Sequence, residues 1–461
     1  MLSPLRTTET RESGFTLIEV LIAMMVFGIT SVLVAYSLTL SMTLTRSSRA
    51  NEVAANLAAQ QIDTARSAKD VFSVKSGTTT QTIDGTDYTI TKTVGWVTST
   101  GAVADCGTSQ GILQNKTLNV SISWSGIRPG TNPVQASTLL APAGPINDPA
   151  SGTILVHVTN ASGAGVANVP ITAKPDPSIT PNTAATITPG PPSTDVDGCS
   201  YALKVTPGAY TVTIGKAGDG SISNSQMQVP TVKASVVAGQ SAVIEMQYDK
   251  AATPKLTLAA AGTLIPTNLP LTYVPQSDPY TTIPTITGVT ATTPLFPFGS
   301  GYSVFAGAFM ASGASQPTCL SVDPQQWTQQ NASGHVGVRA AAIPTPSGAS
   351  IPSTSIAMPV VTVAVSGKWL VAKSAVAAST VGDPGCATAT TTNAMTLTYP
   401  QSSGNAATIA LPYGTWMIYA LSNSGDSLTS SALVDVSKIT RPAGSPAVTS
   451  STVFTLDPRL P

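Results

Sequence analysis

The chain has 461 residues, enough for about three domains, and its formal net charge is zero. Only 10% of the residues are charged, well below the roughly 25% of ordinary globular proteins, and small and hydroxyl-bearing residues take their place. No cluster of Lys and Arg with interleaved aromatic residues occurs, so the composition argues against nucleic-acid binding.

One long apolar run stands near the N-terminus. Residues 15–44 contain no Lys, Arg or Asp, and Glu19 is their only formal charge. A run of this length can span a bilayer as a helix, and a carboxylate within such a span is costly unless it is paired. Glu19 is therefore a candidate functional residue. The alternatives are an ordinary signal-anchor helix with a stray glutamate, or a conventional secretory signal with a mature start near residue 38.

The start of this run resembles the class III signal of type IV pilins and pseudopilins over residues 14–19, which read Gly-Phe-Thr-Leu-Ile-Glu. The resemblance implies that residues 1–14 are a leader peptide, which a prepilin peptidase removes between Gly14 and Phe15. It also implies N-methylation of Phe15 and assembly through Glu19, whose carboxylate would meet a neighbour's Phe15 ammonium. Gly28 falls where many pilins have a glycine, whereas Tyr36 stands where many major pilins have a proline.

The helix is expected to continue beyond the membrane-spanning or fibre-core half, residues 15–44, to about residue 67. One apolar stripe recurs there at spacings of three and four residues, formed by Val53, Ala54, Leu57, Ala58, Ile62 and Ala65. Residues 88–94 and 118–124 then alternate with period two, and 133–140 is a further short strand. Residues 45–147 are therefore predicted to form an amphipathic helix packed on a small antiparallel sheet, the α+β layout of a pilin head.

From residue 151 onward the sequence predicts only β-structure. A proline, a glycine and an aromatic residue open a strand three times, within residues 207–210, 297–302 and 412–416. The spacing of about 90 to 115 residues is the size of a small sandwich. We therefore predict sandwich modules, immunoglobulin- or transthyretin-like, at residues 151–250, 251–345 and 355–461, with the Pro-, Ser- and Ala-rich segment 340–355 separating the last two. The first resembles transthyretin-like or carboxypeptidase-regulatory-like domains.

The four cysteines are widely scattered and contain no C-x-x-C pair. This spacing argues against a metal or thioredoxin-like site, and two disulfides are expected in an exported chain. Three pairings are open, with free buried thiols as the alternative. The pairing that we favour is Cys319–Cys386 together with Cys106–Cys199.

The exported part offers no recognisable catalytic constellation, so no enzyme, metal or cofactor is predicted. The two histidines, His157 and His335, lie far apart in the sequence, and no G-x-S-x-G or H-E-x-x-H motif occurs. Residues 195–198 begin like a calcium loop but lack its later glutamate, which favours a plain turn. Tyr413 and Trp416 are expected in a strand core, with glycan contact as the alternative.

The resemblance implies a structural subunit, a minor pilin or pseudopilin of a type IV pilus or a type II secretion-like fibre. Its expected partners are other pilin subunits, a prepilin peptidase and an assembly platform. The precursor would cross the cell membrane once with its N-terminus in the cytoplasm, and the assembled form would lie at the cell surface. The alternative is a pilin-anchored adhesin whose sandwich modules bind a glycan or matrix ligand.

Overall fold

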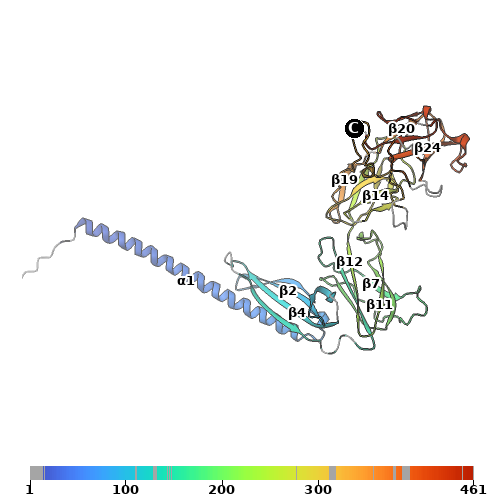
Figure 1. Cartoon of the computed structure of the whole chain (residues 1–461). Coiled ribbons are helices and arrows are strands. Elements are labelled where there is room, and N and C mark those ends of the chain that lie inside the picture. Colours follow the sequence, from blue (N-terminus) through green and yellow to red (C-terminus); the bar gives the residue numbers. More distant parts are fainter. Residues whose placement is uncertain are drawn as a thin grey trace, which may run out of the picture. The chain divides into compact units, whose positions relative to one another are not determined.

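The computed structural model describes residues 14, 16–108, 112–127, 132–142, 144, 146, 148–276, 278–310, 318–356, 358–376, 381–386, 395–448 and 450–459. The chain divides into two compact units, Met1–Ile146 and Asn147–Pro461. One long helix and a sheet form the first unit, and paired sheets form the second (Figure 1). The predicted fold class, a long helix on a small antiparallel sheet followed by β-sandwich structure, is confirmed.

The first unit begins with α1, Leu17–Arg66, a single helix of 50 residues. At 1.5 Å per residue it is about 75 Å long. No proline occurs between Pro4 and Pro129, so every residue of α1 can donate its amide to the helix, and the helix runs through Tyr36 without a break. At its end the Ser67 amide donates to the Asp63 carbonyl at 3.0 Å.

Only the second half of α1 packs on the sheet of its own unit. Ala54, Leu57 and Ala58 are buried there, and the rest of the predicted stripe is partly buried against the same core. The small residues let the helix approach the sheet closely, where Leu118 and Ile122 complete the core. The first half of α1 extends beyond the sheet (Figure 1).

The sheet of the first unit has the order β1-β2-β4-β5, and all of its pairings are antiparallel. Its strands are β1 Gly77–Ile83, β2 Thr86–Thr98, β4 Leu113–Trp124 and β5 Val134–Leu140, and β3 Val103–Ala104 pairs with the end of β2. One short 3₁₀ turn, η1 Val71–Ser73, precedes the sheet in the sequence, and another, η2 Asp105–Gly107, lies between β3 and β4. Asp84 and Gly85 join β1 to β2 with φ values of 49° and 74°, the left-handed pair that a tight hairpin turn requires.

The described residues of the second unit form three pairs of sheets. The first pair has the orders β10-β12-β6-β8 and β11-β9-β7, and its core contains side chains from both sheets, such as Val156 and Val212. Strands β6 and β12 are parallel, whereas the other pairings are antiparallel. The strands are β6 Gly152–Thr159, β7 Ile171–Pro175, β8 Cys199–Val205, β9 Gly208–Ile214, β10 Ser221–Ser223, β11 Thr231–Val236 and β12 Ser241–Lys250.

The second and third pairs of sheets share one hydrophobic core, which extends from Leu256 to Leu456. The second pair has the orders β16-β17-β13-β19 and β15-β14-β18, and the third has β23-β20-β25 and β22-β21-β24-β26. The second pair consists of β13 Thr253–Thr257, β14 Leu271–Val274, β15 Tyr280–Thr282, β16 Thr285–Thr287, β17 Thr290–Thr292, β18 Ser303–Ala306 and β19 Ser350–Ser355. The third pair consists of β20 Val360–Val363, β21 Trp369–Ser374, β22 Thr396–Gln401, β23 Ala407–Ala410, β24 Gly414–Leu421, β25 Ile439–Thr440 and β26 Phe454–Leu456. The loops of the two pairs contain the 3₁₀ turns η3 Pro324–Gln326, η5 Ser430–Ala432 and η6 Val436–Lys438.

One prediction about this region is wrong: the segment 340–355 is not simply a separator. Its end forms β19, which pairs in parallel with β13 and so belongs to the second pair of sheets. The pairing joins residues almost a hundred positions apart, a contact that local composition does not report. The module boundaries at residues 151–250, 251–345 and 355–461 stay a prediction.

The repeated proline–glycine–aromatic pattern has one structural role in all three pairs of sheets. Each aromatic side chain is buried and donates a hydrogen bond back to a carbonyl four or six residues earlier. The bonds are Tyr210 to Thr206 at 2.8 Å, Tyr302 to Phe296 at 2.7 Å and Trp416 to Pro412 at 2.9 Å. Trp416 is thus a core residue, as the sequence predicts, and the pattern resembles the tyrosine corner of other β-sandwiches.

Candidate functional site

Glu19 lies in the first turn of α1, two residues after the helix begins at Leu17. Its amide donates to the Thr16 carbonyl at 3.0 Å, and the Thr16 side chain makes no capping bond. The helix therefore begins with amides that no capping side chain satisfies, and a carboxylate is stabilised at this positive end of the helix dipole. Gly14 is exposed just before this turn, whereas the predicted new N-terminus, Phe15, lies outside the described residues.

Within the described residues, no other part of the chain covers the helix around Glu19. Each described side chain from Thr16 to Arg49 is exposed, including Leu17 at 80% and Phe27 at 73%. The helix is long and apolar enough to cross a membrane. So many exposed apolar side chains need lipid or partner helices around them. Among the described residues, no ion pair includes Glu19.

Four hydroxyl groups in the described part of this apolar half bond to the helix itself. Thr30, Ser37, Thr39 and Thr43 each donate to a carbonyl three or four residues earlier, at 2.8–2.9 Å. Hydrocarbon offers no partner for a polar group, so such internal bonds make these residues tolerable in a membrane. Among the described residues, the Glu19 carboxylate forms neither such a bond nor an ion pair.

Comparison with known families agrees with this geometry. Residues 10–35 match the family model described as the prokaryotic N-terminal methylation motif. The chain carries a prepilin-type N-terminus. This prepilin-type segment contains Gly14, Phe15 and Glu19, and the match ends within the apolar half of α1.

No curated protein matches the sequence. Among solved structures, the Bacillus anthracis TIE protein has 13% identity over 75% of this chain and 64% of its own, with a TM-score of 0.19. The streptococcal ancillary pilin has 13% identity over 52% and 75%, with a TM-score of 0.20. BcpA, the major pilin subunit of Bacillus cereus, has 12% identity over 66% and 95%, with a TM-score of 0.18. This chain spans less than two thirds of the first of these proteins, and scores this low carry no argument about function.

All four cysteines are in disulfides. Cys319 and Cys386 form one bridge, which packs with Phe305 and Phe309 in a small buried cluster. Cys106 and Cys199 are also disulfide-bonded, and no cysteine is free. Their pairing with each other stays a prediction.

The remaining candidate residues have structural surroundings. His157 on β6 lies 4.0 Å from the Glu245 carboxylate on β12, and His335 donates its amide to Asn331 in a loop. The Asp195 carboxylate accepts the amides of Asp197 and Cys199, as expected for a turn. Within the described ranges, no group of three His, Cys, Asp or Glu side chains could hold a metal ion.

Sequence reasoning missed a cavity of about 250 Å³ in the second unit. Tyr413 and Arg339 line it together with Phe305, Met358 and several prolines. The Arg339 guanidinium is held by the buried Asp323 carboxylate, with its Nε atom at 2.7 Å. Burial, with a smaller contribution from Asp457, raises the pKa of Tyr413. These residues come from strand β18 and from loops far apart in the sequence, and no local pattern marks them.

Proposed function

We propose that this chain is a minor pilin or pseudopilin of a type IV pilus or type II secretion-like fibre. The observation that carries the proposal is Glu19, a lone carboxylate in the first turn of an uncovered apolar helix, five residues after Gly14. An anchor that only crossed a membrane would have no use for an acid at this position.

The proposed switch from precursor to subunit is electrostatic. Cleavage between Gly14 and Phe15 by a prepilin peptidase would create an ammonium at the start of the helix. The Glu19 carboxylate of one subunit would then pair with the Phe15 ammonium of its neighbour, which offsets the cost of holding both charges in an apolar core. Methylation of Phe15 would keep the charge while making the amine less polar.

The large second unit supports the minor-subunit part of the proposal. Residues 147–461 form a compact unit beyond the helix and the first sheet. A shaft packed through its helices leaves limited room for so much additional protein on every subunit. The precursor would be anchored by α1 with its N-terminus in the cytoplasm, and an assembly platform would move the processed chain into a fibre at the cell surface.

The test replaces the Glu19 carboxylate by an uncharged amide of nearly the same shape. Glu19→Gln is expected to reduce the chain in sheared fibres at least tenfold, while Glu52→Gln, an exposed glutamate on the same helix, leaves incorporation unchanged. N-terminal sequencing of the mature chain should begin at Phe15. Unchanged incorporation of Glu19→Gln, or a mature start near residue 38, would contradict the proposal.

A second candidate function, a pilin-anchored adhesin, is favoured by the cavity beside Tyr413. A half-buried tyrosine next to an arginine offers an apolar face and donors at one place, a combination suited to a glycan. The mature protein on a glycan array, compared with Tyr413→Ala, tests this function. A bound glycan whose signal disappears in Tyr413→Ala would support it, and no binding would count against it.

A further inference from the structure

Besides the two-residue strand β3, the described sheet of the first unit has two edge strands, β1 and β5, and each pairs on one side only. Both strands have seven residues and contain no charged side chain and no proline. Proteins usually protect such edges with charges, prolines or bulges, because unpaired amides and carbonyls recruit another strand. The pairings of β1 with β2 and of β5 with β4 are regular throughout, so neither edge is distorted by a bulge.

One hydrogen bond between β2 and the end of β4 fixes which main-chain groups of β1 point outward. The Ser125 amide donates to the Asp87 carbonyl at 2.9 Å, so Asp87 faces β4 and its neighbours in β2 face β1. Orientation alternates along an antiparallel strand. The amides and carbonyls of Thr78, Thr80 and Thr82 therefore point away from the sheet, and none of them has a main-chain partner among the described residues.

The same alternation defines the outer edge of β5. In β4, every second residue directs its amide and carbonyl toward β2. The residues between them, such as Ile122 and Val120, direct theirs toward β5. In β5, Val134 and Ala136 lie opposite these two residues and bond them. The alternating residues of β5 therefore direct their amides and carbonyls away from the sheet. These are Gln135, Ser137 and Leu139, whose side chains are exposed.

The direction of the two edges matches a fibre of equally oriented subunits. Because β1, β2, β4 and β5 alternate in direction, β1 and β5 of one copy run oppositely. The β1 edge of one copy can therefore join the β5 edge of the next in antiparallel fashion without inverting either helix.

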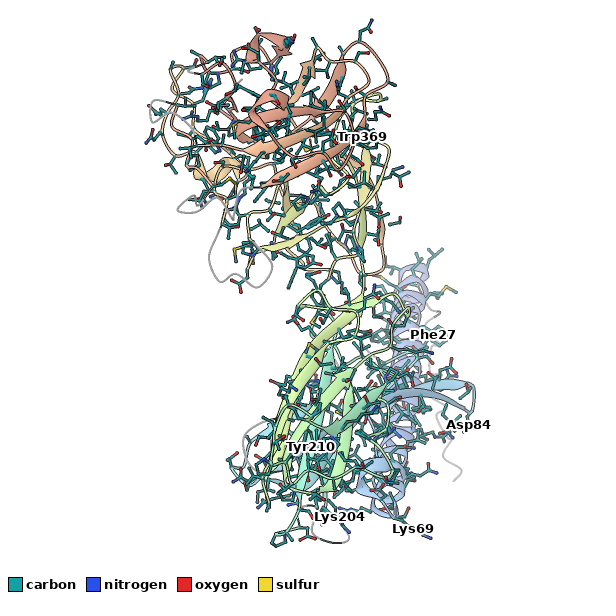
Figure 2. All side chains as sticks on the ribbon, turned by 90° about the vertical axis from the view of Figure 1, so that its right-hand side faces the viewer. Phe27, Lys69, Asp84, Lys204, Tyr210 and Trp369 are labelled. Carbon is teal, nitrogen blue, oxygen red and sulfur yellow. A yellow bond between two sulfur atoms is a disulfide. The ribbon has the colours of Figure 1, made fainter. Side chains whose placement is uncertain are left out.

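We propose that β1 of one copy pairs with β5 of a second copy, so that the sheets of neighbouring subunits become continuous. This proposal rests on the proposed function for the common orientation of the helices. In the register with the greatest overlap, Thr80 lies opposite Ser137 of the second copy, and their side chains share one face. Neither strand contains a charged residue, so no charges would be opposed in this pairing. The hairpin end at Asp84 projects from the sheet (Figure 2).

Disulfide trapping in membranes tests the pairing. Thr80→Cys in one tagged copy and Ser137→Cys in a differently tagged copy are co-expressed in the full chain. Directly opposed residues lie about 5.5 Å apart between Cα atoms, within the range of a disulfide. Since no native cysteine is free, the introduced thiols alone can react. We expect at least ten times more mixed dimer than with Thr93→Cys, an exposed position on the interior strand β2, in place of Thr80→Cys.

A second variant separates pairing from chance collision. Thr80→Pro removes one outward amide, which an edge strand tolerates, and is expected to abolish trapping between Thr82→Cys and Gln135→Cys. Equal trapping with the Thr93→Cys control would overturn the inference. If trapping fails while Glu19→Gln still blocks incorporation, only the sheet pairing is wrong. If trapping succeeds while Glu19→Gln incorporates normally, the pairing stands and the role proposed for Glu19 fails.

Discussion

Gln226 joins the first and second pairs of sheets through two hydrogen bonds. Its amide nitrogen donates to the Tyr302 hydroxyl at 2.8 Å, and its carbonyl accepts the Phe296 amide at 3.0 Å. Tyr302 is fully buried and donates in turn to the Phe296 carbonyl, and burial raises its pKa. Gln226 has a φ of 62°, so it holds a strained conformation at this joint.

Tyr302→Phe should destabilise this joint by about 2 kcal/mol. The variant loses one donor and one acceptor and leaves the carbonyl of Phe296, a residue only 1% exposed, without its partner. Gln226→Ala should cost about 1–2 kcal/mol for its two bonds. Because the two side chains share one bond, the double variant should cost about 1 kcal/mol less than the sum.

Amide hydrogen exchange at Phe296 measures the joint directly, because that amide donates to Gln226. A loss of 2 kcal/mol corresponds to roughly 30-fold faster exchange if the amide exchanges through local opening. Tyr419→Phe is the matched control, since Tyr419 is buried and its hydroxyl makes no hydrogen bond in the part of the chain that is described. Exchange in Tyr302→Phe as slow as in Tyr419→Phe, or strict additivity of the two changes, would refute the reasoning.

Three further predictions concern stability, measured as urea midpoints of the mature chain in detergent. Gly301→Ala should cost about 2–4 kcal/mol, because φ is 67° and a Cβ would lie 2.2 Å from a carbonyl oxygen, whereas Gly299→Ala should change little. A hydrogen bond from Lys233, with further bonds from Ser178, lowers the pKa of Asp176 to about 2. The stabilisation of the fold by ionised Asp176 is therefore complete above about pH 4 and is lost as the pH falls toward 2. Asp176→Asn should therefore flatten the acid limb of stability, and an unchanged limb would contradict the assignment. Replacing Cys319 and Cys386 by serine opens a link across 67 residues and should cost up to about 4 kcal/mol, and an unchanged midpoint would count against a stabilising bridge.

Local patterns predicted much of the fold because they report local burial. The stripe around Ala54 and Leu57 repeats with the helical period and is the face that the sheet covers. Glu19 stood out because the surrounding run is otherwise uncharged. The pattern ending in Tyr302 predicted a strand, and the structure adds the reason for its residue types, a buried hydroxyl that bonds its own chain.

Contacts between segments far apart in the chain could not be predicted from the sequence. Strand β19 lies in a segment whose prolines and serines suggested a linker, and its partner β13 is almost a hundred residues earlier. Gln226 was not singled out because its role requires a second loop, at Phe296, to arrive beside it. The cavity at Tyr413 has the same origin, since its walls combine strand β18 with loops that are far apart in the sequence. Local patterns do not specify which loops meet.

The scarcity of charge has a physical consequence for assembly. Three of the four ion pairs in the described residues use a carboxylate that is at most 4% exposed, on Asp176, Asp323 or Asp457. Such pairs place part of the few charges inside the protein and leave a largely neutral surface. Neutral surfaces repel one another little, so copies brought together by their helices can approach closely, and salt screens only weak forces between them. Contact between the β1 and β5 edges should therefore depend on main-chain geometry, and trapping of Thr80→Cys with Ser137→Cys should vary less than twofold between low and high salt.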